Sequence, residues 1–223
     1  MQKKTLQSDI EVFDNILSKQ EVLDIHGEFI HKSFPWHMVS GAVLVGEEYK
    51  IATSNIPNNV DTNTFEAFQF CHLFADNNTN MSGKSYVTDF IMKKLSEKVE
   101  LSEYNYVHRI KANFQSRFLS DPDCYNTPHY DSPDKHLVII YYVNNSDGDT
   151  FIFENDTYPL KVKQRVSPKA GRFLIFNGNQ LHAGIHPKIN DYRIVINFNL
   201  MSVNSNLINE NTWEDWDTQN DNY

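Results

Sequence analysis

The spacing of apolar and polar positions predicts an amphipathic helix near the N-terminus. Apolar side chains recur at helical spacing from Val22 to Phe29, and Ser18 followed by Glu21 forms a capping-box pattern. We therefore expect a helix over residues 19–32.

A second stretch with apolar positions at helical spacing predicts a helix over residues 85–99. Between the two helices, no secondary structure is assigned to the apolar and aromatic run Phe65–Phe74, and residues 76–83 have the polar composition of a loop. Residues 1–104 are therefore expected to form a helical or irregular preamble.

From about residue 105 onward, the apolar period becomes two. Short runs rich in Val, Ile, Tyr and Phe alternate with turn residues, which is typical of a sandwich, barrel or jelly roll. The predicted strands are residues 107–114, 136–143, 150–154, 160–166, 171–176 and 192–200. Helices first and strands after indicate an α+β chain that is mainly β, with the helices packed on one sheet. We expect one domain over residues 1–202, with its β core at 105–202, and a polar acidic tail at 203–223.

The composition is that of a globular protein with an acidic surface. Hydrophobic residues make up 40% of the chain, the formal net charge is -9 and the pI is about 5.4. Because acidic surfaces repel phosphate backbones, nucleic acid is not expected as a partner. The two cysteines lack metal or disulfide spacing, the N-terminus lacks an apolar signal segment, and no stretch reaches about 18 apolar residues. We expect a cytoplasmic protein (in the host cytoplasm if viral) without a membrane partner; its oligomeric state is not predicted.

Three residues form a candidate metal site. His129 and Asp131 are two positions apart, so in an extended segment their side chains point to the same face. His182 follows an apolar predicted strand, from which it can reach across a barrel mouth. Two imidazoles and one carboxylate on one face leave open metal positions, which is the facial triad of non-haem Fe(II) oxygenases.

Arg193 is a candidate anion-binding residue. It follows His182 by eleven positions and shares a strand face with Val195 and Asn197. A cation on an otherwise apolar face is unfavourable unless it is paired, and a planar guanidinium suits a carboxylate. The partner is either the carboxylate of a bound ligand or one of the 29 acidic residues of the chain.

Several motifs appear in a fixed order along the β core. They are His129-Tyr130-Asp131, Ile140–Asn144, Asp147–Phe151, Ser167–Arg172, Leu181-His182 and Arg193. In order, spacing and turn chemistry, this segment of a little under half the chain resembles the prolyl-4-hydroxylase-like branch of the 2-oxoglutarate/Fe(II)-dependent dioxygenases, in particular its phage and marine bacterial members.

The resemblance implies a double-stranded β-helix, a jelly-roll or cupin-like fold, in which His129, Asp131 and His182 bind Fe(II). It further implies that Arg193 binds the C5 carboxylate of the co-substrate 2-oxoglutarate and that Tyr142 hydrogen-bonds the same carboxylate. Simple core packing is the alternative role for Tyr142. Ascorbate is an additional cofactor candidate.

The chain departs from this family on the strand before the first metal ligand. Relatives often have a tyrosine there, close to the co-substrate; here Lys111 and Asn113 are the alternatives for its place. Asn197 is a further candidate contact to co-substrate or substrate. Residues 115–128 are expected to form a loop that can act as a lid. No catalytic residue is expected beyond the metal ligands.

The implied activity is hydroxylation of an unactivated C–H bond with release of succinate and CO2. The expected substrate is a peptide, with a peptidyl prolyl residue as one candidate, or a small molecule. A demethylase of nucleic acid or of a small metabolite would use the same chemistry, but the acidic charge disfavours it. A non-enzymatic β-helix module with a vestigial metal site is the third alternative, which the intact triad and Arg193 disfavour.

Overall fold

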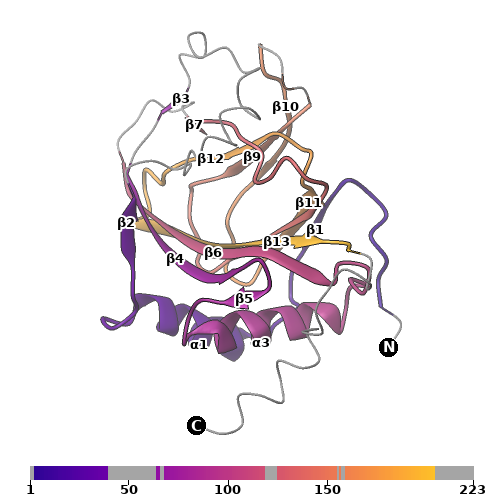
Figure 1. Ribbon diagram of the computed structural model, residues 1–223. Helices are drawn as coiled ribbons and strands as arrows, with labels where there is room; N and C mark the ends of the chain where they lie inside the picture. The colour runs from indigo at the N-terminus through magenta and orange to yellow at the C-terminus, as the bar shows by residue number, and fades with distance from the viewer. Residues whose placement is uncertain are drawn as a thin grey trace, which may run out of the picture.

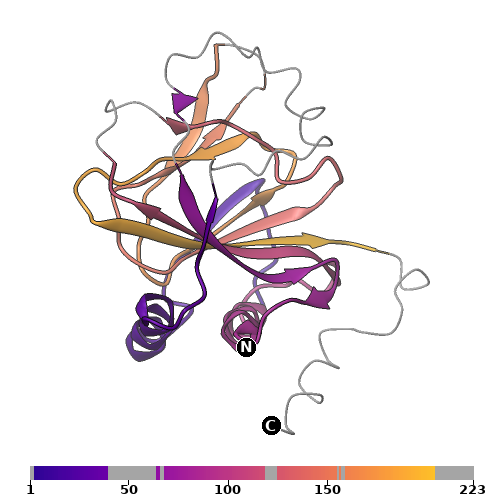
Figure 2. The same cartoon turned by 60° about the vertical axis from the view of Figure 1, so that its left-hand side comes forward.

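The structure, a computed structural model, describes residues 3–39, 64–65, 68–118, 125–154, 156 and 159–203. These residues form three layers, which are two helices, a large antiparallel sheet and a smaller sheet facing it (Figures 1 and 2). From residue 204 onward, the predicted acidic tail lies outside the described residues.

Both predicted helices are present and cover the same face of the large sheet, as expected (Figure 1). Helix α1 spans Lys19–Ile30 and begins with the predicted capping box, in which the Ser18 and Glu21 side chains each accept from the other residue's backbone N–H. Helix α3 spans Ser85–Ser96 and ends earlier than predicted. Neither they nor any other helix of the described segments is long and apolar enough to cross a membrane.

The large sheet has eight strands in the order β1-β11-β8-β13-β6-β4-β2, with β5 also paired to β4, and all its pairings are antiparallel. Its strands are β1 (Ile10–Phe13), β2 (His37–Val39), β4 (Gln69–Asp76), β5 (Thr79–Asn80), β6 (Tyr106–Ser116), β8 (Leu137–Tyr142), β11 (Phe173–Asn177) and β13 (Tyr192–Met201).

The smaller sheet has the order β10-β9-β12 and is also antiparallel. Its strands are β9 (Thr150–Phe153), β10 (Val162–Val166) and β12 (His182–Gly184). Beside it, β3 (Thr64–Phe65) pairs in parallel with β7 (Tyr125–Asn126). Two facing antiparallel sheets with helices on one outer face confirm the predicted double-stranded β-helix.

The central strands of the large sheet are buried on both faces. All six residues of β8 are buried, so this strand is one apolar run, the pattern of a strand covered on two sides. Tyr141 belongs to the cluster that also contains Phe29 of α1 and Leu95 of α3, whereas Tyr142 and Leu174 belong to the cluster between the sheets. The candidate site therefore lies on the sheet face that points away from the helices.

The predicted preamble of residues 1–104 is less irregular than its pattern suggested, because it supplies β1, β2, β4 and β5 to the large sheet. Most of the aromatic run Phe65–Phe74 belongs to β4, whose register shifts between Leu73 and Ala75. Such an irregularity breaks the alternation of a strand, so the sequence of this run did not indicate a strand plainly. The predicted loop that begins at Gln115 begins later, because β6 continues to Ser116.

Candidate metal and co-substrate site

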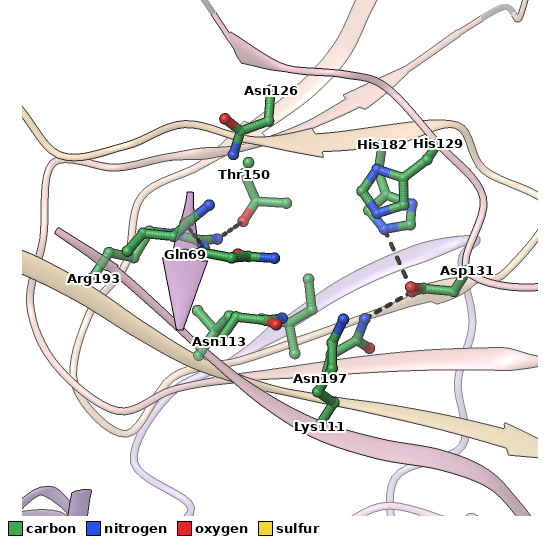
Figure 3. Close-up of a pocket in the computed structure, with 14 residues that line it drawn as sticks. Gln69, Lys111, Asn113, Asn126, His129, Asp131, Thr150, His182, Arg193 and Asn197 are labelled. Atoms are coloured by element: carbon green, nitrogen blue, oxygen red, sulfur yellow. Dashed lines mark hydrogen bonds and ion pairs between the residues drawn. The ribbon is translucent and has the colours of Figure 1, made fainter. Parts of the chain in front are cut away.

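His129, Asp131 and His182 come together between the two sheets. One ligand atom from each residue lies within 4.8 Å of the others. His182 is the first residue of β12 rather than part of a loop, and it pairs with His129 through two backbone hydrogen bonds of 2.9 and 3.1 Å. This pairing holds the two imidazoles beside each other (Figure 3).

Each imidazole is oriented by a backbone carbonyl. Nδ1 of His129 lies 3.0 Å from the oxygen of Thr127, and Nδ1 of His182 lies 3.1 Å from the oxygen of Gln180. Because a carbonyl only accepts, both Nδ1 atoms carry the proton and both Nε2 lone pairs are free for a metal. Burial and the neighbouring His182 lower the pKa of His129 to about 4, so this ring is neutral at physiological pH.

Asp131 is held from two sides. It is only 3% exposed, its Oδ1 accepts from Nη2 of Arg109 at 2.9 Å, and its Oδ2 accepts from Nδ2 of Asn197 at 2.8 Å. Burial alone would raise the pKa of Asp131, but the neighbouring His182 and the charge of Arg109 hold it well below its usual value. The carboxylate is therefore ionised, as a metal ligand must be.

The two groups that hold Asp131 are themselves linked through Asn199, which is fully buried. In the amide orientation that satisfies both of its polar atoms, Asn199 accepts from Arg109 at 3.2 Å and donates to Oδ1 of Asn197 at 2.9 Å. Such outer contacts fix the direction of a metal ligand. The donor set of two imidazole nitrogens and one ionised carboxylate fits Fe(II).

Arg193 lies at the opposite end of the same pocket (Figure 3). It is 4% exposed; Nη1 donates to Oε1 of Gln115 at 2.7 Å, and Nη2 donates to Oγ1 of Thr150 at 2.9 Å. Its Nε is buried and has no partner among the described residues. Arg193 forms no ion pair with any acidic residue that the structure describes. An acidic residue of the chain, the alternative to a bound ligand as the partner of Arg193, is therefore wrong for the described segments.

Gly148 brings the backbone close to Arg193. A Cβ atom at this position would lie 2.5 Å from the oxygen of Ile185 and 2.8 Å from Cδ of Arg193. Any larger residue would therefore displace either the Ile185 backbone or the stem of Arg193, so glycine keeps the guanidinium in place.

Comparison with known proteins agrees with this geometry. Residues 115–201, which contain the triad and Arg193, match the 2OG-Fe(II) oxygenase superfamily. These residues belong to that superfamily. The protein is therefore an enzyme, an oxygenase that uses Fe(II) and 2-oxoglutarate. No curated protein sequence matches the chain.

Two of three solved structures share the fold of the oxygenase at low sequence identity, and the third is a weaker match from which no shared fold follows. A 2OG-Fe(II) oxygenase family oxidoreductase from Burkholderia pseudomallei has a TM-score of 0.59 at 12% identity, over 88% of this chain and 86% of that chain. The epimerase SnoN from nogalamycin biosynthesis has a TM-score of 0.57 at 9% identity, over 87% and 78%. The viral collagen prolyl hydroxylase of Paramecium Bursaria Chlorella virus-1 has a TM-score of 0.49 at 17% identity, over 88% and 97%.

Tyr142 of the oxygenase reaches the Arg193 end of the site through Thr150. Its hydroxyl donates to Oγ1 of Thr150 at 2.8 Å, and its ring centre lies 6.0 Å from the guanidinium carbon of Arg193. Burial raises the pKa of Tyr142 to about 12, so the hydroxyl keeps its proton. Thr150 is among the residues that line the pocket, whereas Tyr142 is not. A direct hydrogen bond from Tyr142 to the co-substrate therefore stays a prediction.

One wall of the pocket is a ladder of side chains from β6 and β13 of the oxygenase. On β6, Lys111, Asn113 and Gln115 alternate towards the pocket, and in register they oppose Asn197, Val195 and Arg193 of β13. Lys111 is 7% exposed, and burial followed by the charge of Arg109 lowers its pKa to about 8. Oδ1 of Asn113 is buried and has no partner in the described part of the chain. Both residues predicted to replace the family tyrosine therefore face the site.

Sequence reasoning missed three contacts of this site in the oxygenase, which are Arg109 on Asp131 and Gln115 and Thr150 on Arg193. The available signal was the alternation of polar residues from Arg109 to Gln115 along a predicted strand. The same alternation is typical of a strand with one solvated face, and only the second sheet shows that this face is internal.

Proposed function

We propose that the protein hydroxylates an unactivated C–H bond with Fe(II) held by His129, Asp131 and His182 and 2-oxoglutarate anchored by Arg193. The observation that carries the proposal is the grouping of the three ligand atoms within 4.8 Å in the same pocket as a buried arginine. When bound, Fe(II) and 2-oxoglutarate supply the oxidation: one atom of O2 enters the substrate as hydroxyl, and 2-oxoglutarate leaves as succinate and CO2.

The residues of the chain position these groups. The Nε2 atoms of His129 and His182 and one oxygen of Asp131 would hold the metal, and two neutral ligands with one anionic ligand leave part of its +2 charge for an anionic co-substrate. Arg193 would bind the C5 carboxylate with its guanidinium, whose direction Gln115 fixes by a hydrogen bond.

Thr150 is suited to assist Arg193. Its Oγ1 accepts hydrogen bonds from both Tyr142 and Arg193, so its own proton is free to be donated. Such a donor would approach the C5 carboxylate directly. On this basis Tyr142 supports the co-substrate through Thr150 as well as through any direct contact.

The substrate is proposed by class only. A peptide, including one with a prolyl residue, or a small molecule fits the chemistry, and the net charge of -9 disfavours nucleic acid. Incubation with host-lysate peptides and metabolites, followed by mass spectrometry for the gain of one oxygen atom, would identify it.

The activity itself is tested by succinate release in the presence of Fe(II), 2-oxoglutarate and O2. We expect release from the native protein and none from His129→Ala or Asp131→Ala. His31→Ala is the matched control, because it removes an exposed histidine outside the pocket. If His129→Ala released succinate as fast as the native protein, or if the native protein bound neither Fe(II) nor 2-oxoglutarate, the proposal would be wrong.

A further inference from the structure

Lys111 is a buried cation that the proposed function leaves without a task. Its side chain lines the pocket and is 7% exposed. Within the described segments, its ammonium group makes no hydrogen bond and no ion pair. Burying an unpaired ammonium group is unfavourable, so a position of this kind indicates a negatively charged partner that arrives with a ligand.

The position of Lys111 along the strands places it at the metal end of the pocket. In register it opposes Asn197, which donates to Asp131, whereas Arg193 opposes Gln115 at the other end (Figure 3).

Asp131 is not the partner that Lys111 lacks. Its Oδ1 already accepts from Arg109 and its Oδ2 from Asn197, and no ion pair joins its carboxylate to Lys111. The charge of Asp131 acts on Lys111 only at longer range. A second anion is therefore needed close to the metal ligands.

A lysine beside a divalent metal is repelled unless an anion lies between the two cations. 2-Oxoglutarate has two carboxylates, and Arg193 is at the correct end for only one of them. We propose that Nζ of Lys111 binds the C1 carboxylate of 2-oxoglutarate, the one at the metal end. Lys111 is then a second anchor of the co-substrate, an inference that rests on the proposed function.

The test uses binding, not turnover, of the full chain loaded with Zn(II), which does not support oxidation. The ligands are 2-oxoglutarate and two analogues that each lack one carboxylate. In 2-oxopentanoate a methyl group replaces the C5 carboxylate, and in 4-oxopentanoate a methyl group replaces the C1 carboxylate. Calorimetry gives the Kd of 2-oxoglutarate, and competition observed by ligand NMR gives those of the analogues.

Lys111→Met should raise the Kd of 2-oxoglutarate and of 2-oxopentanoate roughly 10-fold to 100-fold, the range for a hydrogen bond to a charged group. The Kd of 4-oxopentanoate should stay unchanged. Arg193→Met should show the reverse selectivity. Lys111→Arg should restore part of the lost affinity. Lys135→Met is the matched control, because it removes an exposed lysine outside the pocket.

Metal affinity in the absence of 2-oxoglutarate is the second readout. Because Lys111→Met removes a repelling cation, the variant should bind Zn(II) at least as tightly as the native protein, whereas a merely structural defect would weaken both metal and ligand. If Lys111→Met left 2-oxoglutarate and 2-oxopentanoate binding unchanged while Arg193→Met weakened 2-oxoglutarate, the inference would be overturned and the proposed function would stand. If neither variant affected binding, both would fall.

Discussion

Asn197 offers a direct test of how Asp131 is oriented. We predict that Asn197→Leu, which keeps the number and branching of the side-chain heavy atoms but removes the amide donor, weakens metal binding. Asn197 is the better choice than Arg109, because removing the charge of Arg109 would also reduce repulsion of the metal. Its Nδ2 lies 2.8 Å from Oδ2 of Asp131 inside the buried site.

The magnitude follows from this single contact. A hydrogen bond to a charged group contributes about 1.5–3 kcal/mol. If all of that free energy serves to orient Asp131, the Kd of the metal rises about 10-fold to 100-fold, which is also the range for contacts that hold metal ligands. Asn197→Leu also removes the acceptor to which Asn199 donates. The upper part of this range is reached only if Arg109 alone does not keep Asp131 in its orientation.

The assay is titration of the metal-free protein with Mn(II), followed by electron paramagnetic resonance of the unbound ion. Asn190→Leu is the matched control, because Asn190 is exposed and lies outside the pocket. Circular dichroism of the metal-free variants checks that the fold is kept. A Kd within about twofold of the native value would refute the reasoning, because the hydrogen bond would then contribute nothing to the direction of the ligand.

Three further predictions concern the scaffold. Hydrogen bonds from Arg172 and then Lys169 lower the pKa of Asp14 to about 2. The ionised group therefore contributes about 2 kcal/mol of stability above pH 4, and this contribution is lost as the pH falls towards 2. In urea unfolding, Asp14→Asn should be less stable than the native protein by that amount at pH 7 and should not show this decrease at low pH. Gly148→Ala should lower the stability by about 1–3 kcal/mol in the same assay and weaken 2-oxoglutarate, because its Cβ would meet the Arg193 stem; unchanged binding would contradict the role of this glycine. Ser18→Ala should cost about 1 kcal/mol in thermal unfolding without changing 2-oxoglutarate binding, since it removes only the cap of α1.

The sequence predicted those parts of the fold that have an undisturbed period. The capping box and apolar face of α1 and the apolar run of β8 needed no tertiary information. Strand β4 was missed because its register shifts between Leu73 and Ala75. Strand β1 was missed because its four residues precede a helical pattern, whereas the equally short β9 lies in a series of strands.

The candidate site was predictable where a residue type has few other uses. Two histidines and an aspartate at ligand spacing suggested a metal, and they lie together in the structure. Contacts such as Gln115 on Arg193 were not predictable, because an amide on a strand looks the same whether it faces solvent or a pocket. Only the facing sheet decides between these environments.

The backbone pairing of His129 with His182 also has a consequence for folding. These two residues are far apart in the sequence, and the hydrogen bonds between them form only when the segment around His129 and strand β12 come together. Long-range contacts of this kind form late in folding because the chain must first lose the entropy of a long loop. A partly folded chain would thus have no preformed site, and iron would select and stabilise the completed fold, with a gain that grows with free metal concentration.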